Sequence, residues 1–514
     1  MSKTIIIIGA GLAGLSAALQ AAENGCNVKL VSSLPSERAQ SVMAEGGINA
    51  ALNTKDENDS PEEHFTDTIK AACGLADPNA VWGMTQAAPE LVHWLLKLGV
   101  KFNMSGYDDV DLRNFGGQKK KRTAFAQSDT GKQIMTAMID AVRRKEASGM
   151  VERFSHHSFL TLRLCGNICC GCVIRDEYSQ ETVELPGDAV IVATGGMHGL
   201  FGNTTGSLSN TGEVTAELFR LGVPLANGEM IQYHPTTVKC GGKRMLISEA
   251  ARGEGGRLFA MKDGKQWYFM EEKYPELGNL MPRDITAREI WKVSHESEVF
   301  LDMTEISEEI ISNKLSGLAD DCMTYLHKDI RKEPVSVLPG IHYFMGGILV
   351  DEQHRTPIQN LYAAGECCAQ YHGANRLGGN SLLGALYGGR VAAKSACEQA
   401  DVVDLSCATQ IDFPPASQIS EIKQLNKVMQ ETMGVVRNEN TLLNGIQTVQ
   451  ALTGNLPLLG MAVLKSALAR KESRGALWRE DYPKSNDNDY LKTTVARFDG
   501  KQIQISFVPV PERR

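Results

Sequence analysis

Three glycines near the N-terminus have the spacing that a phosphate-binding turn requires. Gly9, Gly11 and Gly14 follow an apolar run, Thr4 to Ile8, and precede an alanine-rich segment. In such a turn the first glycine permits the tight bend, the second lets the backbone approach a pyrophosphate, and the third lets a helix pack closely on a strand. The start of that helix adds amide donors and partial positive charge. The turn therefore predicts a dinucleotide site formed by Gly9, Ala10, Gly11, Leu12, Ala13 and Gly14.

The elements around the turn are expected in the order strand, helix, strand, which is the context that this motif needs. The helix should end near Gly25, and the second strand should cover residues 28–31. An acidic residue usually follows that strand and holds a ribose hydroxyl, but Ser32 and Ser33 stand there. A serine hydroxyl can still accept this hydrogen bond, less strongly than a carboxylate. The motif alone therefore does not decide between NAD and FAD.

Three later segments favour FAD. The first is residues 44–48, and the others, residues 190–196 and 361–366, are each an apolar strand that ends in a turn of small residues. Small residues are needed where the backbone must pass close to a long cofactor. A nicotinamide site seldom needs such distant returns of the chain, whereas an extended FAD does. The sequence thus predicts an α/β, Rossmann-type fold that binds FAD.

Length and composition indicate a multi-domain protein without a membrane span. At 514 residues the chain exceeds what one hydrophobic core usually supports, so two or three domains are expected. No window approaches the roughly 18 apolar residues that cross a bilayer. The first apolar run lacks the features of a signal peptide, so we expect a cytoplasmic protein. The net charge of -8 argues against nucleic acid as a partner, and the basic run Lys119 to Arg122 is expected to be a solvated loop.

The 12 cysteines are scattered and do not indicate a disulfide framework. Cys165, Cys169, Cys170 and Cys172 do cluster, but their neighbours alternate in hydrophobicity as in a hairpin, and Gly166-Asn167 would form its turn. We interpret these cysteines as small strand residues and not as metal ligands. No metal site is predicted, and no motif for covalent haem occurs.

Eight ordered blocks of sequence carry a resemblance to one family. They lie at residues 9–14, 44–47, 232–236, 248–256, 282–284, 342–347, 373–382 and 472–476. In these blocks the chain resembles, nearly end to end, the flavoprotein subunits of fumarate reductase and succinate dehydrogenase and their relative L-aspartate oxidase. The resemblance implies a Rossmann-type FAD-binding domain (residues 1–225 and 350–405), an inserted α+β capping domain (226–349) and a helical C-terminal segment (406–514). Apolar positions at helical spacing, Ile422, Leu425, Val428 and Met429, agree with the last of these.

The resemblance also implies roles for individual residues. Arg283 would deliver a proton, with Glu249 and Arg252 as its relay. Glu249 and Arg252 are three residues apart, so they would share one face if that stretch is helical. A guanidinium is a weak acid, so the proton that it loses must be replaced quickly. The alternative is that these three residues form only a structural ion-pair network.

The same resemblance implies two further sets of residues, one that binds the substrate and one that binds FAD. The substrate's two carboxylates would be held by His234, Ser248, His342 and Arg376, with Phe115 beside them. Taken alone, His234 would be interpreted as a hydrogen-bonded core histidine, but the block at residues 232–236 that contains it favours a role in substrate binding. FAD would be bound by the glycine turn together with Ser32, Ser33, Ser41, Ala44, Glu45, Gly46, Gly47, Ala193, Thr194, Gly195, Glu213, Glu366, Arg376, Asn380, Ser381 and Leu382.

Two departures from the family pattern refine the prediction. Gln40 stands where a histidine carries covalently attached FAD in succinate dehydrogenases and membrane fumarate reductases. An amide nitrogen cannot form that bond, so FAD should be noncovalent. Its potential should then be lower, which favours fumarate reduction. Phe115 stands where aspartate oxidases have an acid for the substrate's ammonium, and a phenyl ring cannot neutralise that charge.

The sequence therefore predicts an FAD-dependent fumarate reductase. L-aspartate oxidase is the alternative, supported by Gln40 and by the short C-terminal segment, and a non-catalytic flavoprotein binding subunit is a second alternative from another class. The expected partners are fumarate or succinate and an iron-sulfur electron-transfer subunit. The chain itself should not span a membrane, although partner subunits could bring it to one.

Overall fold

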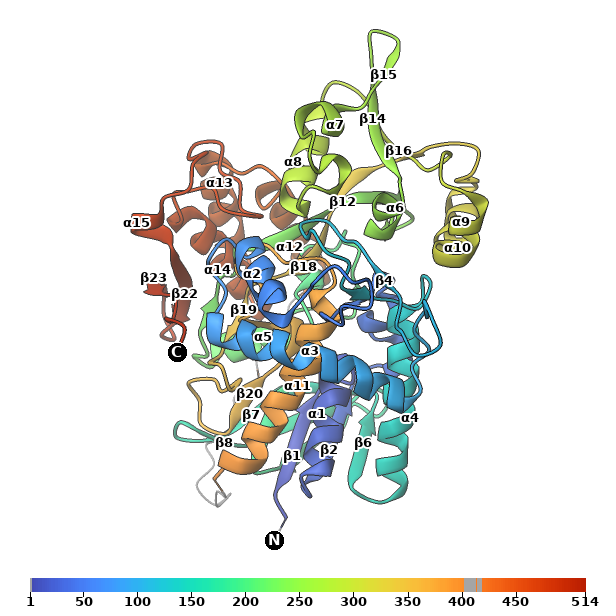
Figure 1. Cartoon of the computed structure of the whole chain (residues 1–514). Coiled ribbons are helices and arrows are strands. Elements are labelled where there is room, and N and C mark those ends of the chain that lie inside the picture. Colours follow the sequence, from blue (N-terminus) through green and yellow to red (C-terminus); the bar gives the residue numbers. More distant parts are fainter. Residues whose placement is uncertain (1, 402–412, 414–417) are drawn as a thin grey trace.

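The computed structural model describes residues 2–401, 413 and 418–514. Figure 1 shows a parallel sheet and its helices in the lower part of the molecule, with the N-terminus beneath them. A mixed region of short helices and hairpins, coloured green to yellow, lies above this sheet, and the red C-terminal segment lies at the side of both.

The central sheet has five parallel strands in the order β20, β10, β1, β2, β6. The predicted order of strand, helix and strand is confirmed by β1 (Thr4–Ile8), α1 (Leu12–Glu23) and β2 (Asn27–Ser32). The two distant segments return to the same sheet as β10 (Ala189–Val192) and β20 (Leu361–Ala363). The edge strand is β6 (Val151–Ser155).

Side chains on the two faces of β1 enter two different cores, as alternation along a strand requires. Ile5 and Ile7 lie against helices, and Ile6 and Ile8 lie against an antiparallel sheet. The helices on the first face are α1, α3 (Pro78–Leu98), α4 (Thr130–Ala147) and α11 (Asn380–Gln399). The sheet on the second face consists of β7 (His157–Cys165), β8 (Ile168–Asp176) and β9 (Thr182–Pro186).

The cysteine-rich segment forms the predicted hairpin, because β7 and β8 are antiparallel and join at Gly166-Asn167. Cys169 and Cys172 are buried in the core between this hairpin and the parallel sheet. They therefore serve as small core residues. Among the described residues, no group of three or more His, Cys, Asp or Glu side chains is placed to hold a metal ion.

The region above the sheet begins and ends at neighbouring strands. β11 (Leu225–Ala226) pairs with β19 (Gly347–Leu349), so the chain leaves and returns at one place. Its first sheet contains β12 (Ile231–Cys240), β13 (Lys243–Leu246) and β18 (Leu338–Phe344). Its second sheet contains β14 (Arg257–Lys262), β15 (Lys265–Trp267), β16 (Val299–Asp302) and β17 (Val335–Ser336).

Short helices complete this upper region and share one apolar core with its second sheet. They are α6 (Glu249–Gly253), α7 (Phe269–Lys273), α8 (Arg283–Val293), α9 (Glu308–Lys314) and α10 (Ser316–Asp321). Figure 1 shows that the hairpin of β14 and β15 projects from the top of the molecule.

The C-terminal segment is helical, as expected, but it ends in a hairpin that the sequence did not predict. Its helices are α12 (Ile419–Thr432), α13 (Glu439–Val449), α14 (Asn455–Ala469) and α15 (Asp487–Tyr490). In α12, Leu425 and Met429 are buried, which confirms the helical spacing. The hairpin of β22 (Lys492–Phe498) and β23 (Ile503–Pro509) adds to β11, so the tail joins a sheet that also holds β19 and β21 (Cys368–Ala369).

The interpretation of the basic run as a solvated loop is wrong for Arg122. Its guanidinium is fully buried and forms ion pairs with Asp59 at 2.8 Å and Asp67 at 2.9 Å. Asp67 lies on α2 (Pro61–Ala71), and Arg122 comes just before β5 (Thr123–Ala124). Sequence reasoning missed the pairing because both acids are more than 50 residues away along the chain.

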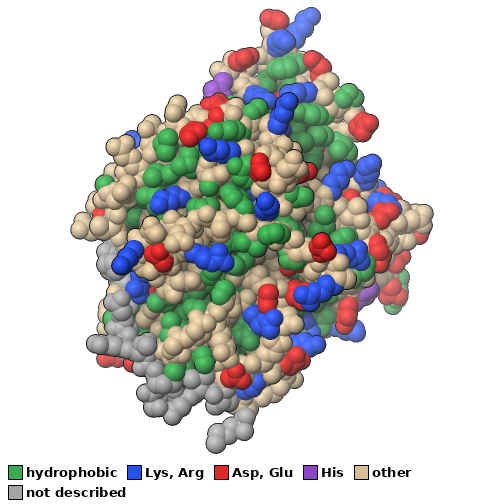
Figure 2. Space-filling model, turned by 90° about the vertical axis from the view of Figure 1, so that its left-hand side faces the viewer, with side chains coloured by type: hydrophobic (Ala, Val, Ile, Leu, Met, Phe, Trp, Pro, Cys, Tyr) green, Lys and Arg blue, Asp and Glu red, His purple; other side chains and the backbone are tan. Residues whose placement is uncertain are grey.

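The surface gives no sign of a single dominant charge on the face that Figure 2 shows, because basic and acidic side chains are interspersed there.

No helix in the described ranges is both long enough and apolar enough to cross a bilayer.

Candidate functional site

A cavity of about 530 Å³ lies between the parallel sheet and the upper region. On the sheet side it is lined by the glycine turn, the end of β2, the short 3-10 helix η2 (Gln40–Met43) and the residues that follow β10 and β20. On the other side it is lined by residues of β12, β13, β18, α6 and α8. Ligands of open α/β sheets bind at the carboxyl ends of the strands, and this cavity occupies that place.

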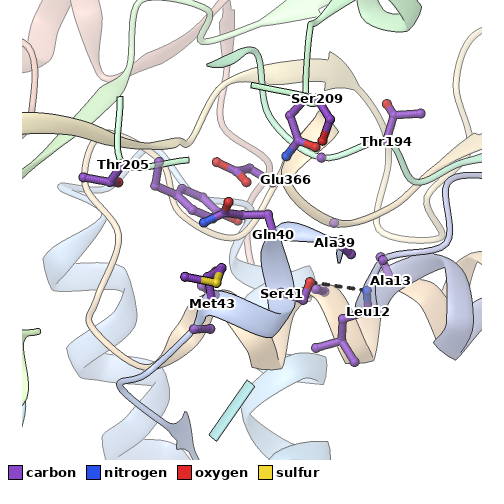
Figure 3. A pocket seen from close by; sticks show the side chains of 18 of the residues that line it. Leu12, Ala13, Ala39, Gln40, Ser41, Met43, Thr194, Thr205, Ser209 and Glu366 are labelled. Atoms are coloured by element: carbon purple, nitrogen blue, oxygen red, sulfur yellow. Dashed lines mark hydrogen bonds between the residues drawn. The ribbon is translucent and has the colours of Figure 1, made fainter. Parts of the chain in front are cut away.

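The glycine turn has the tight backbone geometry that its sequence predicts. Gly9 has a φ of +111°, and a Cβ there would lie 2.3 Å from the carbonyl oxygen of Ala193. A Cβ on Gly14 would lie 1.8 Å from the carbonyl oxygen of Gly9, so only glycine lets α1 pack this close to the turn. Figure 3 shows the adjoining hydrogen bond, in which the backbone N–H of Leu12 donates to Oγ of Ser41 at 3.3 Å.

Several buried polar atoms around the cavity have no hydrogen-bond partner among the described residues. They include Ser32 Oγ at the end of β2 and Glu45 Oε2 in the loop after η2. Burial, followed by the charge of Asp321, raises the pKa of Glu45 to about 8. Buried polar atoms are normally paired, so these atoms fit a polar ligand that runs from β2 towards η2.

The cavity brings together most of the residues that sequence reasoning assigned to the cofactor. Gly14 and Asn380 are not among its lining residues. Asn380 instead bonds to Asn49, His64 and Thr68. Those that do line it are Gly9, Ala10, Gly11, Leu12, Ala13, Ser32, Ser33, Ser41, Ala44, Glu45, Gly46, Gly47, Ala193, Thr194, Gly195, Glu213, Glu366, Arg376, Ser381 and Leu382.

Two histidines face each other at the end of the cavity under the upper region. His234 lies on β12 and His342 lies on the neighbouring strand β18, and their ring centroids are 5.1 Å apart. Burial and the nearby charge of Arg283 lower the pKa of both imidazoles well below 6.5. Both rings are therefore neutral at pH 7. Nε2 of His234 is buried and has no partner in the described part of the chain.

Arg376 lies beside these histidines, in the loop before α11. It is 3% exposed, and its guanidinium carbon is 4.4 Å from the ring centroid of Tyr343. Burial, and then the charge of Arg283, lower the pKa of Arg376 to about 9. Its Nε is another buried atom that no described residue pairs. A buried arginine that no described carboxylate pairs fits an anion.

Arg283, Glu249 and Arg252 form one continuous ion-pair chain. Oε2 of Glu249 accepts hydrogen bonds from Nε and Nη2 of Arg283 at 2.8 and 2.6 Å. Oε1 of Glu249 accepts from Nη2 of Arg252 at 3.3 Å. Burial acts to raise the pKa of Glu249, but the charges of Arg283 and Arg252 outweigh it and hold that pKa below 4.5. Arg283 and Glu249 line the cavity, and Arg252 lies behind them.

The helix α6 accounts for this order. Ser248 is its N-cap and accepts from the backbone N–H of Ala250 at 3.4 Å. The helix then places Glu249 and Arg252 one turn apart, as predicted. The backbone N–H of Gly116 also donates to Glu249 Oε1 at 3.1 Å, so the loop after β4 (Leu112–Arg113) helps to fix the carboxylate.

Phe115 is 2% exposed and lines the cavity. It packs against two glycines, because a Cβ on Gly46 would come within 2.6 Å of Phe115 Cζ and a Cβ on Gly378 within 3.2 Å of Phe115 Cβ. Phe115 thus packs between the predicted cofactor loop and the loop that carries Arg376.

Sequence reasoning missed three residues of this site. Nη1 of Arg283 donates to Oε1 of Gln232 at 3.0 Å, Tyr343 lies under Arg376, and Oγ1 of Thr205 is 2.8 Å from Nδ1 of His342. Gln232 and Tyr343 stand in the blocks that carry the family resemblance. Thr205 stands outside those blocks, and no pattern in the sequence marks it.

The fold and the cavity are those of an FAD-dependent oxidoreductase. The family described as FAD binding domain matches residues 4–382, and the family described as fumarate reductase flavoprotein C-term matches residues 452–513. The chain is 37% identical to the succinate dehydrogenase flavoprotein subunit of Bacillus subtilis, with 100% of this chain and 98% of that protein covered. It is 32% identical to the 8-methylmenaquinol:fumarate reductase flavoprotein subunit of Wolinella succinogenes, with 100% and 92% covered.

A mutant of E. coli quinol fumarate reductase FrdA has a similar structure, with a TM-score of 0.90 at 27% identity over 99% of this chain and 97% of that one. The chain belongs to the family of succinate dehydrogenase and fumarate reductase flavoprotein subunits, and its cofactor is FAD.

Proposed function

We propose that the chain reduces fumarate to succinate. The observation that carries the proposal is the presence, in one cavity, of an anion clamp (His234, His342, Arg376) and the ion pair of Arg283 with Glu249. The clamp provides cationic and neutral donors for two carboxylates. The ion pair holds the guanidinium of Arg283, the proposed proton donor, beside this clamp.

FAD, when bound along the glycine turn and η2, supplies the hydride that the reaction needs. The chain's own contribution is to hold the dicarboxylate and to provide the proton. Arg376 offers a planar pair of donors to one carboxylate, and the neutral imidazoles donate to carboxylate oxygens on which charge increases during reduction.

Arg283 is the proton donor in this proposal. Glu249 occupies its Nε and Nη2, and Gln232 occupies Nη1, which leaves one N–H on each terminal nitrogen free for the substrate. Glu249 faces Arg283 with Oε2 and Arg252 with Oε1, so it can pass a proton from Arg252 to Arg283 after turnover. The same contacts would also stabilise a purely structural network, so variants must separate the two roles.

The direction of reaction rests on Gln40. Its side chain lines the cavity, and its Oε1 accepts from the backbone N–H of Ser207 at 2.6 Å. Because an amide cannot form the covalent link to FAD, we propose that FAD is noncovalent and that its potential favours reduction of fumarate. The name of the Bacillus subtilis relative favours succinate oxidation as the second candidate.

We further propose an iron-sulfur protein as the electron donor and a cytoplasmic location, by resemblance to relatives named as flavoprotein subunits. On this proposal a reduced low-potential dye supports fumarate turnover by the purified chain, whereas a quinol does not. Quinol-driven turnover by the pure protein would refute the need for a partner.

The direction is tested by comparing two initial rates with the same purified protein and matched dyes. One is fumarate-dependent oxidation of a reduced low-potential dye, and the other is succinate-dependent reduction of a high-potential dye. The proposal predicts that the first rate is the larger. A larger succinate-dependent rate would replace fumarate reduction with the second candidate.

A further inference from the structure

Thr205 lies on the wall of the cavity, in a loop between η3 (His198–Leu200) and α5 (Glu213–Arg220). Figure 3 shows its side chain on the same cavity as Gln40 and Glu366. Its Oγ1 is 2.8 Å from Nδ1 of His342, which is a normal hydrogen-bond distance. This contact joins a residue without an assigned role to the substrate end of the site.

A neutral imidazole has one N–H, so a partner on one ring nitrogen decides what the other can do. If Nδ1 of His342 accepts a hydrogen bond, Nε2 carries the hydrogen and can donate to an anion. If Nδ1 donates, Nε2 becomes an acceptor and would repel a carboxylate. His342 is therefore useful in an anion clamp in only one of its two tautomers.

The surroundings of Thr205 favour the first arrangement. Its hydroxyl has a second acceptor, the carbonyl oxygen of Ile341, but that oxygen is 3.3 Å away and already accepts the backbone N–H of Thr205 at 3.0 Å. The contact with His342 is shorter, so the single hydroxyl hydrogen of Thr205 is assigned to it, with Nδ1 of His342 as the acceptor.

The loop that carries Thr205 is held by hydrogen bonds on both sides of that residue. The carbonyl oxygen of Thr204 accepts from the backbone N–H of Arg244 at 3.1 Å, and the backbone N–H of Ser207 donates to Oε1 of Gln40 at 2.6 Å. Oγ1 of Thr204 also bonds to Nδ1 of His198 at 3.0 Å. These contacts hold the loop against β13 and η2 on both sides of Thr205.

We propose that Thr205 is a positioning residue that donates its hydroxyl hydrogen to Nδ1 of His342 and so keeps Nε2–H directed at the substrate carboxylate. The anion site rests on the proposed function, but the tautomer of His342 does not depend on which dicarboxylate is reduced. Gln40 contributes to this arrangement, because its side chain accepts a hydrogen bond from Ser207 in the loop of Thr205.

The test uses the holoprotein with 15N-labelled histidine. NMR signals of the two ring nitrogens report the tautomer, and His342→Asn identifies the signals that belong to His342. The wild-type protein should show His342 protonated at Nε2. Protonation at Nδ1 would overturn the proposal, and this measurement requires no folded variant of Thr205 and no turnover.

Two variants test the cause. Thr205→Val keeps the size and removes the donor, whereas Thr205→Ser keeps the donor. In Thr205→Val the ring signals of His342 should change, and fumarate should bind the oxidised protein on the order of 10-fold more weakly, as expected for a partly buried hydrogen bond left unmade. Thr205→Ser should restore both readouts to within about 2-fold of wild type. Equal signals and equal affinity in all three proteins would contradict the proposal.

If fumarate binds none of these proteins, the proposed function fails. The ring signals still decide the role of Thr205 in that case.

Discussion

Oε2 of Glu249 accepts two hydrogen bonds from the guanidinium of Arg283, from Nε at 2.8 Å and from Nη2 at 2.6 Å. The side chain of Glu249 is 1% exposed and that of Arg283 is 7% exposed, so little of the ion pair is accessible to water. Such a pair fixes the orientation of the guanidinium. The same carboxylate also bonds to Arg252, so it connects the two arginines. The following variants test whether the connection serves chemistry or only structure.

Arg283→Lys should reduce fumarate turnover on the order of 100-fold to 10,000-fold, the usual range for loss of a positioned proton donor. Lysine keeps the charge but loses the planar pair of donors, so fumarate should still bind. Arg376→Lys should instead weaken binding more than Arg283→Lys does, because Arg376 belongs to the clamp. Rates and dissociation constants of both variants, measured on one preparation of each, separate the two effects.

Arg288→Lys is the matched control, since Arg288 lies on the same helix, α8, but stacks on Trp478 outside the cavity. It should keep wild-type turnover. Near-normal turnover of Arg283→Lys with impaired binding alone would mean that the acid is another residue, with His342 as the next candidate.

Glu249→Gln should slow the proton-dependent step on the order of 100-fold or more, because an amide keeps the shape but cannot pass a proton. Removing one member of a buried ion pair also leaves uncompensated charge, so the free energy of unfolding should fall by about 3 kcal/mol. Single-turnover reoxidation and thermal melting measure the two effects independently.

Glu308→Gln is the control for this substitution. Glu308 forms an ion pair with Arg331 at 3.0 Å, and the two side chains are 72% and 36% exposed, so the variant should melt and turn over like wild type. A Glu249→Gln protein that melts earlier yet keeps its rate would show that the network is structural.

The parts of the fold that sequence reasoning predicted are those set by local rules. The glycine turn, the strands at residues 190–192 and 361–363, the cysteine hairpin and the buried face of α12 all follow from spacing and alternation. The family resemblance supplied His234, His342 and Arg376, and the cavity indeed brings them together. The residue limits of the domains stay predictions.

The parts that were missed depend on contacts between distant segments. Arg122 is buried because it meets Asp59 and Asp67, and Thr205 matters because a loop from the sheet side reaches a histidine on β18. The hairpin of β22 and β23 resembles any other short pair of strands until its partner β11 is known. Pairings of this kind leave no local pattern.

FAD should be released when the purified yellow protein is precipitated with acid, because Gln40 cannot bond to it covalently. The supernatant should contain FAD, and the pellet should be colourless. Flavin that stays with the pellet would contradict the assignment of position 40 and would remove the argument for a low flavin potential.

The protein should lose stability as pH falls below 6.5, in part through His64. His64 lies on α2, is fully buried and contacts Asn380 of α11, and burial lowers its pKa from 6.5 to about 3. The folded protein thus binds fewer protons than the unfolded chain between these pH values, and its stability falls with decreasing pH by up to about 1.4 kcal/mol per pH unit. Above pH 6.5 this contribution is complete.

His64→Gln keeps a donor for Asn380 and removes the titration, so the difference in melting temperature between pH 7 and pH 5 should be smaller than in wild type. His93→Gln, which changes an exposed histidine on α3, is the control and should leave this difference unchanged. An equal pH dependence in all three proteins would show that His64 does not contribute.

Fumarate reduction by this chain is tested by mixing the photoreduced protein with fumarate in the absence of oxygen and following the flavin absorbance in a stopped-flow instrument. Fumarate should reoxidise the flavin far faster than air does, and this rate should fall on the order of 100-fold or more in Arg283→Lys. L-aspartate should not reduce the oxidised protein. Flavin that stays reduced in the presence of fumarate, or that is bleached rapidly by L-aspartate, would contradict fumarate reduction as the activity of this chain.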